Sequence, residues 1–380
     1  YMVVDWRADH SLRLPRPDLS RETGVPNACT QSGCHDDQPL AWSLRYYTRW
    51  YGEAKRPHYG QVFAAARAGQ PEAREQLIQM AADPLYPALV RATALDYLSR
   101  YPGEESTGAF NLALQDEDPL IRYTALSNAS AATPERYVEL VAPLLFDPVK
   151  AVRIEAAMRL ADAPAAMLQP YQQAQRAAGL AEYERTMAYS LDFAFAGHNL
   201  GNLYGRLGDA ARAERYYRTA LEIDDLFYPA KSNLAVLLNS QGRNDEAEVL
   251  LRELVEDYPE QYEAAYSLGL LLAEMQRVDQ AVEFLGRASA GMPQRARAHY
   301  NYGLALQAVG RVGAAETALR RALAVEPENI DFLFALADHY VRRGQLERAL
   351  TLADRMIALD PDNPIGRQVK QYVEGQLAGR

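Results

Sequence analysis

The stretch GHNLGNLYGRLGDAARAERYYRTALEI, residues 197–223, carries a pattern of small residues that the sequence after it repeats. Glycines recur at a step of 34 residues: Gly208, Gly242, Gly310 and Gly344, with Gln276 in the remaining slot. Two further positions hold only small residues at the same step: Ala213, Ala247, Ala281, Ala315 and Ala349, and Gly201, Ala235, Gly269, Gly303 and Ala337. Antiparallel helices pack closely where side chains are small, and glycine permits the turn between them. The pattern therefore predicts a series of helix–turn–helix units.

Prolines end successive units of this series: Pro259, Pro293, Pro327 and Pro361, with Asp225 at the matching position of the first unit. A repeat of 34 residues with small residues at these positions is the signature of tetratricopeptide repeats. The grid predicts an array over 194–365 that contains five units: 194–227, 228–261, 262–295, 296–329 and 330–363. A last helix at 366–380 is polar enough to cover the open end of the array, as solenoids require.

A second, shorter repeat precedes the first. The segments VRATAL (90–95), IRYTAL (121–126) and VRIEAA (152–157) place Arg91, Arg122 and Arg153 at a step of 31 residues. An Asp-Pro pair stands ahead of each segment: Asp83-Pro84, Asp118-Pro119 and Asp147-Pro148. We expect the aspartate to cap a helix whose first position is the proline. This pattern resembles HEAT-type helical repeats, and we expect each arginine to pair with an aspartate of the neighbouring repeat.

The predicted fold class is all-α, a right-handed superhelical solenoid. Residues 1–60 form an irregular segment rich in His, Trp and Tyr, 61–164 hold the HEAT-like repeats, and 165–193 form a helical connector or a degenerate unit of the second array. The tetratricopeptide array and the last helix follow.

Composition excludes several classes of function. The net charge is −10 and no cluster of lysine and arginine would form the basic face that nucleic-acid binding needs. No apolar stretch reaches the eighteen or so residues that a membrane span requires. Neither a nucleophile–base signature nor a phosphate-binding loop is present, so we expect no enzymatic activity. The chain starts at Tyr1 without an initiator methionine, as a mature or trimmed product would.

Both cysteines lie in one short stretch, NACTQSGCHDDQ (27–38), with His35 directly after the second. Covalent haem needs two thiols and a histidine after the second one, usually spaced C-x-x-C-H. Here Cys29 and Cys34 are two residues further apart, but the order is kept. His10 and His58 are the nearby histidines that could supply a second axial ligand to the iron.

Two other interpretations of this stretch stay open. A metal site would use both cysteines, His35 and a fourth group such as His10, His58 or Asp36, although adjacent Cys34 and His35 would ligate a single zinc ion awkwardly. A disulfide between Cys29 and Cys34 would suit an exported protein. Downstream, Trp42, Tyr46 and Trp50 recur every four residues and share one helix face, which would cover a macrocycle or fill a small core.

The order of these parts resembles the C-terminal part of bacterial multihaem c-type cytochromes that carry tetratricopeptide repeats. The likeness runs through YMVVDWRADHSLRLPRPDL (1–19), PNACTQSGCHDDQ (26–38) and WYGEAKRPHYG (50–60) into both repeat arrays. It implies that Cys29, Cys34 and His35 hold haem c and that His10 is an axial ligand to this or a neighbouring haem. It also implies export to the periplasm or the cell exterior, and further haem motifs upstream in the family.

The first helix of each tetratricopeptide unit is expected to line the concave side of the array. One position per unit, called row one here, reads His198, Ser232, Tyr266, Tyr300 and Phe334. The next inward position, called row two, reads Asn202, Val236, Leu270, Leu304 and Asp338. These rows would seat an extended peptide or a partner helix, unless the rings pack between units.

Two functions follow from the sequence. The first is an exported electron-transfer module in which the repeats dock a redox partner, other cytochromes or further copies of the chain. The alternative is an interaction scaffold without redox activity, in which the cysteines form a disulfide or remain free thiols.

Overall fold

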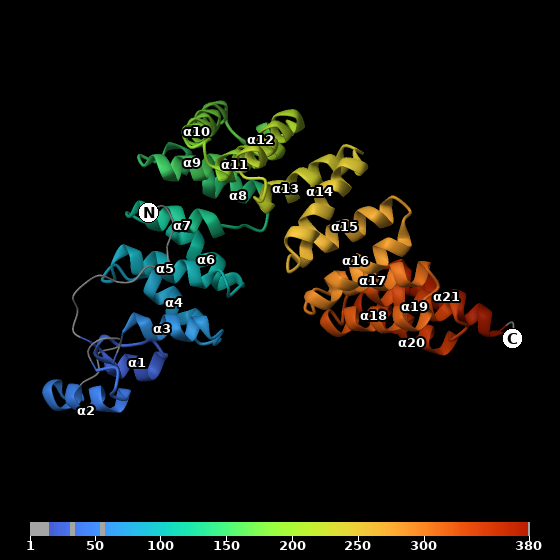
Figure 1. The fold of residues 1–380 in the computed structure, drawn as a ribbon, viewed down its shortest axis with the longest axis horizontal. Coiled ribbons are helices and arrows are strands. Elements are labelled where there is room, and N and C mark those ends of the chain that lie inside the picture. Colours follow the sequence, from blue (N-terminus) through green and yellow to red (C-terminus); the bar gives the residue numbers. More distant parts are fainter. Residues whose placement is uncertain (1–14, 31–34, 54–57, 379–380) are drawn as a thin grey trace. The chain divides into compact units, whose positions relative to one another are not determined.

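The computed structural model describes residues 15–30, 35–53 and 58–378, and every regular element in these ranges is helical (Figure 1). The predicted all-α class is confirmed. The chain divides into two compact units, 1–186 and 187–380. No helix within the described ranges is long and apolar enough to cross a membrane.

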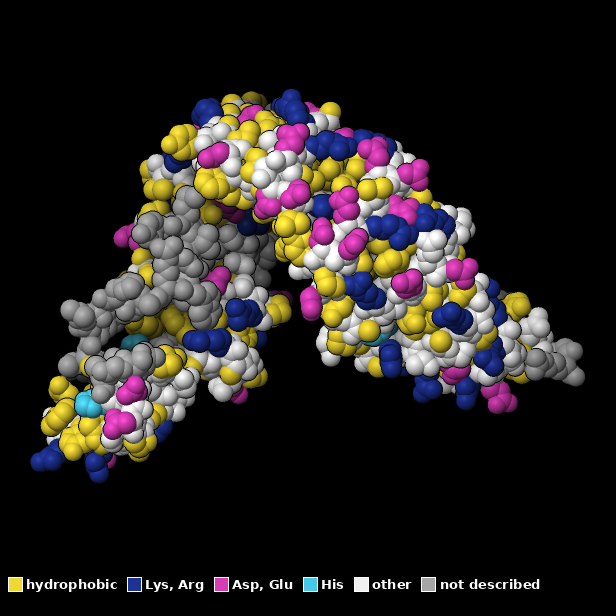
Figure 2. All heavy atoms as spheres, viewed as in Figure 1, with side chains coloured by type: hydrophobic (Ala, Val, Ile, Leu, Met, Phe, Trp, Pro, Cys, Tyr) yellow, Lys and Arg dark blue, Asp and Glu magenta, His cyan; other side chains and the backbone are white. Residues whose placement is uncertain are grey.

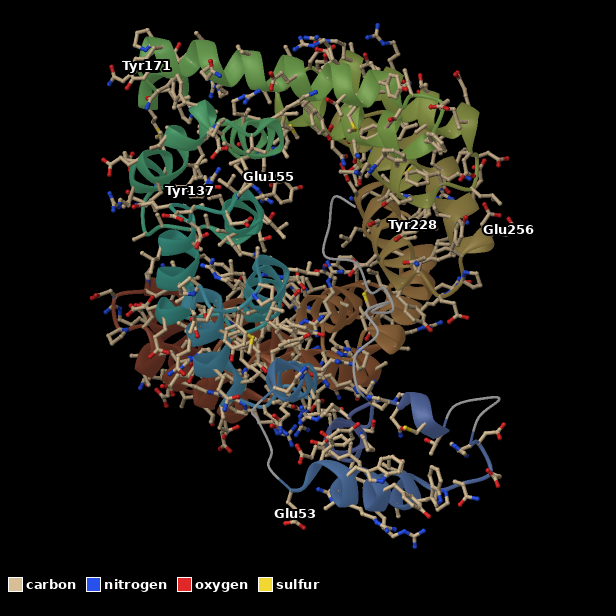
Figure 3. All side chains as sticks on the ribbon, turned by 90° about the vertical axis from the view of Figure 1, so that its left-hand side faces the viewer. Glu53, Tyr137, Glu155, Tyr171, Tyr228 and Glu256 are labelled. Atoms are coloured by element: carbon tan, nitrogen blue, oxygen red, sulfur yellow. The ribbon has the colours of Figure 1, made fainter. Side chains whose placement is uncertain are left out.

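The first unit contains short helices. They are α1 (Pro17–Thr23), α2 (Leu40–Tyr51), α3 (Tyr59–Arg67), α4 (Ala73–Ala82), α5 (Ala88–Leu98), α6 (Glu104–Ala113), α7 (Pro119–Asn128), α8 (Pro134–Val141) and α9 (Lys150–Arg159), with 3-10 turns at Ala28–Thr30, Ala142–Phe146 and Ala165–Met167. The longer α10 (Pro170–Tyr189), which carries Tyr171 near its start in Figure 3, runs across the division between the units.

The Asp-Pro pairs act differently from one repeat to the next. Asp118 caps α7 as predicted, since its Oδ1 accepts a hydrogen bond of 2.8 Å from the amide of Leu120 and Pro119 is the first helical residue. The prediction is wrong for Asp83 and Asp147. Their carboxylates accept amide hydrogen bonds two residues on, from Leu85 and Val149, in loops that end before α5 and α9 begin. The carboxylate still satisfies a backbone amide there, but in a turn ahead of the helix.

Two of the repeated arginines pair with an aspartate of the next repeat, as predicted, whereas the third pairs with a glutamate of the connector helix. Arg122 makes a bidentate pair with Asp147, at 2.7 and 3.0 Å. Arg91 pairs with Asp116, and Arg153 pairs with Glu182 at 3.1 Å. Glu182 belongs to α10, so this connector helix supplies the acid that completes the ladder of ion pairs.

The second unit consists of five helical hairpins and a final helix. They are α11 (Ala194–Arg206), α12 (Ala210–Ile223), α13 (Tyr228–Ser240), α14 (Asn244–Asp257), α15 (Tyr262–Glu274), α16 (Val278–Gly291), α17 (Ala296–Ala308), α18 (Val312–Val325), α19 (Ile330–Arg342), α20 (Leu346–Leu359) and α21 (Pro364–Ala378). The turn glycines adopt positive φ angles, for example 75° at Gly208. Gln276 fills its slot with φ 61° and is the one non-glycine residue with positive φ in the described part of the chain.

Small residues at the helix crossings are required by close contact. A Cβ atom on Gly269 would lie 2.7 Å from Cγ of Leu285, and one on Gly303 would lie 2.8 Å from Cγ of Leu319. Both distances are too short for carbon atoms, so the 34-residue grid reflects where α15 meets α16 and α17 meets α18.

Replacing Gly303 by alanine is expected to lower the free energy of unfolding of the fourth repeat by about 1–3 kcal/mol, because the new methyl group overpacks the crossing. Gly313→Ala in α18 is the matched control, since nothing lies within 4 Å of its added Cβ. The control should gain about 0.5–1 kcal/mol from its higher helix propensity. Amide hydrogen exchange of α17 and α18 measures both changes; effects of the same sign would contradict the prediction.

Candidate functional site

Row two offers exposed apolar side chains along successive first helices. Val236 of α13, Leu270 of α15 and Leu304 of α17 are 59%, 38% and 37% exposed, although they lie among helices whose other apolar residues form the core. Three such residues, 34 positions apart, place one apolar side chain on each of three consecutive repeats. Single exposed apolar residues are common, but a regular row of them is typical of a binding surface.

Row one is mostly not accessible. Tyr266 is only 7% exposed, with the guanidinium of Arg295 over its ring and its hydroxyl accepting a hydrogen bond of 2.6 Å from Asn301. Tyr300 is half-buried, and its ring centroid lies 4.9 Å from that of Phe332. The prediction that both rings face a partner is therefore wrong for Tyr266, which packs between repeats. Phe334, 44% exposed, is the aromatic member of row one that a partner can reach.

The N-terminal end of the rows is a polar cluster. His198 Nε2 lies 3.1 Å from Asn233 Nδ2 and 3.3 Å from Asn202 Nδ2. Burial lowers the pKa of His198, although a hydrogen bond with Asn199 opposes this. Asn202 Oδ1 in turn accepts hydrogen bonds of 2.8 Å from both Tyr217 Oη and Asn233. Each of these side chains is already engaged within the fold.

A groove lies between α19 and α21 at the C-terminal end of the rows. Its volume is about 560 Å³, and its lining is mainly apolar: Phe334, Val341, Ile365, Val369 and Tyr372, with Asp338, Arg342 and Gln368. Gln368 and Tyr372 stand 34 residues after Phe334 and Asp338, so α21 extends both rows by one step. Sequence reasoning missed this role because it treated α21 as a polar cap; the same 34-residue step was the available signal.

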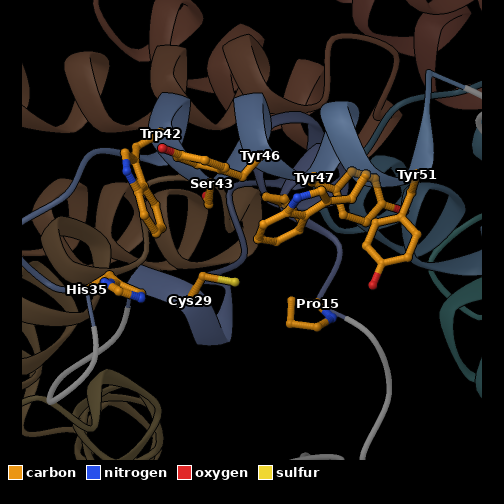
Figure 4. A pocket seen from close by; sticks show the side chains of 10 residues that line it. Pro15, Cys29, His35, Trp42, Ser43, Tyr46, Tyr47 and Tyr51 are labelled. Atoms are coloured by element: carbon orange, nitrogen blue, oxygen red, sulfur yellow. The ribbon is translucent and has the colours of Figure 1, made fainter.

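A second candidate site lies near the N-terminus, on α2 (Figure 4). A pocket of about 340 Å³ is lined by Pro15, Pro17, Cys29, His35, Trp42, Ser43, Tyr46, Tyr47, Trp50 and Tyr51. The predicted aromatic face is confirmed, since the ring centroids of Trp42 and Tyr46 lie 5.0 Å apart and those of Tyr46 and Trp50 lie 5.6 Å apart. His35 packs against this face, with its ring centroid 4.5 Å from that of Trp42.

The turn that carries Cys29 is fixed by Asn27, which is buried. Asn27 Oδ1 accepts a hydrogen bond of 2.9 Å from the amide of Cys29, and its Nδ2 donates to Thr30 Oγ1 at 3.1 Å. Cys29 is half-buried. Cys29 and His35 thus line one aromatic pocket.

Other predicted ligands fall elsewhere. Cys34 and His10 lie outside the described residues, and the Cys29–Cys34 disulfide and the His10 axial ligand remain predictions. The structure corrects the role of His58: it caps α3, with Nδ1 accepting a hydrogen bond of 3.0 Å from the amide of Gly60, and it is not among the pocket-lining residues. Across the described ranges no group of three His, Cys, Asp or Glu residues could hold a metal ion.

The described residues of this pocket fit a covalently bound haem in their chemistry. Cys29 supplies one of the two thiols that attachment requires and His35 the imidazole that ligation requires, and both line the same space. The rest of the lining is aromatic or proline apart from Ser43, which suits an apolar macrocycle. The volume falls at the lower end of the roughly 300–1,000 Å³ that is usual for ligand pockets.

Comparison with known proteins identifies the second array. The tetratricopeptide repeat family matches residues 206–272, 238–309 and 300–364. Tetratricopeptide repeats are therefore confirmed in the second unit, whereas the resemblance to multihaem cytochromes stays a prediction. No curated protein matches the chain.

Two similar solved structures have low identity. The crystal structure of YrrB, a TPR protein with an unusual peptide-binding site, is 21% identical and covers 50% of this chain and 97% of its own, with a TM-score of 0.45. MamA 41-end from Desulfovibrio magneticus RS-1 is 21% identical and covers 45% of this chain and 96% of its own, with a TM-score of 0.42.

Proposed function

We propose that this chain is a protein–protein interaction scaffold whose tetratricopeptide array binds a protein partner along row two and the α19–α21 groove. The observation that carries the proposal is the row of exposed apolar side chains at Val236, Leu270 and Leu304. Burying apolar surface contributes about 25 cal/mol per Å². Covering this row with a partner therefore supplies a driving force for association.

The charged side chains around the rows are paired within the fold, which favours binding of the partner through apolar contacts. Arg342 pairs with Asp338 at 2.7 Å, and the buried Lys231 pairs with Glu253 at 3.0 Å. Figure 2 shows basic and acidic side chains interspersed over the visible face of the second unit. Binding by such a surface depends on shape and apolar contact more than on net charge.

A photo-crosslinking residue tests the scaffold function. Benzoylphenylalanine in place of Leu304 should form adducts with a protein in an extract of the native source, because row two faces the partner. The matched control is the same residue in place of Val249, which is 58% exposed on α14, a second helix of the array. Equal adduct formation at both positions would reject row two as the binding surface.

A second function is favoured by the N-terminal pocket, where Cys29 and His35 converge on an aromatic wall. In this proposal the thiols of Cys29 and Cys34 would hold haem c covalently, and His35 and His10 would be the residues that ligate its iron. Trp42 and Tyr46 would exclude water from the macrocycle. The bound group would supply electron transfer, and the chain would work in the periplasm or outside the cell, docking other cytochromes or further copies of itself.

Spectroscopy after expression in a host that matures c-type cytochromes tests this second function. We expect a coloured product that keeps its haem absorption after denaturation and organic extraction, with a mass above the 42.4 kDa of the polypeptide. His35→Ala should shift the absorption spectrum, whereas His198→Ala, in the other unit, should leave it unchanged. A colourless product with the polypeptide's mass would exclude covalent haem.

A further inference from the structure

We propose that His339 is a pH-sensitive switch in the last repeat: its neutral ring joins α19 to α17, and protonation of the ring opens this junction. The inference goes beyond the proposed scaffold function, because it concerns the stability of one repeat and does not depend on what the array binds. Three observations carry it: the hydrogen bond that His339 makes, the burial of its second ring nitrogen, and the charged groups around the ring.

The position of the ring proton on His339 is fixed by its neighbours. Gln307 of α17 donates from Nε2 to the Asp338 carboxylate at 3.2 Å, and a carboxylate only accepts hydrogen bonds. Gln307 therefore presents its Oε1 to His339, whose Nδ1 lies 2.9 Å away. Because an amide oxygen also only accepts, Nδ1 of His339 carries the proton. In the neutral ring Nε2 is then the nitrogen without a proton.

A second proton on His339 would lie at a buried atom. The residue is 1% exposed, and its Nε2 is buried without a hydrogen-bond partner among the described residues. Protonation would place an N–H group and a positive charge at this atom. Burying a charged donor that lacks an acceptor is costly, so the folded repeat disfavours the imidazolium form. The unfolded chain, in which water accepts the hydrogen bond, carries no such penalty.

His299 of α17 is also buried, at 4% exposure, but both of its ring nitrogens have partners. Its Nε2 lies 3.0 Å from the Pro293 carbonyl oxygen, and its Nδ1 lies 2.6 Å from Ser289 Oγ. The carbonyl only accepts, so Nε2 carries the proton, and the hydroxyl can either donate to Nδ1 or accept from it. A second proton on His299 would therefore find an acceptor. Burial is common to both histidines, and the acceptor at the second nitrogen distinguishes them.

The charged groups around His339 do not remove the penalty. Burial lowers the pKa of His339 from its usual value of 6.5, and Arg343 lowers it further. The carboxylates of Glu316 on α18 and Asp338 on α19 oppose burial but do not overcome it. Glu316 is also paired with Arg348 of α20, at 3.5 Å. Helices α17 and α21 pack against α19 as well, and no charged group in their described residues acts on this pKa.

The direction of this shift sets the pH window. Because the pKa of His339 is lower in the folded repeat than in the unfolded chain, the unfolded chain binds the proton first as the pH falls. The stability that the neutral ring supplies is therefore complete above about pH 7.5 and is lost as the pH falls through about 6.5. Opening of the junction would also displace Asp338 and Arg342, which line the α19–α21 groove.

Amide hydrogen exchange of α19 and α20 in the full chain, at pH 7.5 and pH 5.5, tests the switch, because ordinary carboxylates stay mostly ionised in this range. Dividing each rate by the intrinsic exchange rate gives the opening equilibrium constant. In the native chain this constant should rise at least about threefold at pH 5.5. His339→Asn, whose amide can still donate to Gln307 but binds no proton, should show no rise. The matched control His299→Gln, whose amide can still donate to the Pro293 carbonyl, should keep the rise.

A second readout needs no variant to fold. The ¹⁵N chemical shifts of the labelled His339 ring should show a proton on Nδ1 and none on Nε2 at pH 7.5, with no titration of the folded ring at or above pH 6.5. A proton on Nε2 at pH 7.5, or titration of the folded ring near pH 6.5, would overturn the switch. An opening equilibrium constant that does not change with pH in the native chain, or that rises equally in His339→Asn, would overturn it too.

Discussion

Replacing Arg122 by alanine is expected to lower the free energy of unfolding of the first unit by about 3–5 kcal/mol, the usual loss when one member of a buried ion pair is removed. The Asp147 side chain is 3% exposed and would lose its cationic partner, keeping only the hydrogen bond from the Val149 amide. Nη1 of Arg122 also donates to the carbonyl oxygens of Asp116 and Glu117, at 2.7 and 2.8 Å. These two carbonyls would lose their donor in the same substitution.

Amide hydrogen exchange of α7 and α9 measures this effect better than a single melting temperature, since repeat arrays unfold in parts. The matched control is Arg136→Ala on α8, where the pair with Glu139 is exposed on both sides. Such surface pairs contribute about 0–1 kcal/mol. If both substitutions reduce protection equally, the ladder of ion pairs is not what joins the HEAT-like repeats.

Replacing Phe332 by alanine is expected to cost about 3–5 kcal/mol in the second unit, because a buried aromatic side chain leaves a cavity. Phe332 is among the largest fully buried side chains, and it supports the ring of Tyr300 and the guanidinium of Arg297, which lies 5.1 Å from its centroid. Loss of the ring removes the contact between α17 and α19 at this point.

Phe334→Ala is the matched control on the same helix, two residues away. Its side chain is exposed, so the free energy of unfolding should change by less than about 0.5 kcal/mol. Hydrogen exchange of α19 and α20 compares the two variants directly. A larger loss for Phe334→Ala than for Phe332→Ala would mean that the burial of these two positions is reversed in solution.

The sequence predicted the repeats because their determinants are local and recur. The repeated position that Gly303 occupies must hold a small residue, because one helix crosses the next there. A Cβ on Gly303 would clash with Leu319, which explains why the 34-residue grid keeps this position small. The first two ion pairs of the arginine ladder were predictable for the same reason, since Arg91 and Arg122 each meet an aspartate of the next repeat. The aromatic face of α2 could be predicted from the four-residue spacing of its rings alone.

The acid that completes the ladder was less predictable. Glu182 lies on α10, within a connector whose sequence does not follow the HEAT-like pattern, so its pairing with Arg153 depends on how α10 packs. The same holds for His58, whose role as the cap of α3 belongs to no repeat. Both cases concern a single side chain that no repeating pattern marks.

What the sequence alone determined is the all-helical class, the 34-residue repeat and the residues that share each row. Only the tertiary structure decided which row members a partner can reach. Tyr266 and Phe334 occupy the same position of the repeat, yet Tyr266 is buried and Phe334 is exposed. Arg295, at the end of the same repeat, and Asn301 of the next repeat cover Tyr266, whereas Phe334 borders the groove beside α21. Exposure is set by side chains far along the chain, which the spacing of one position cannot specify.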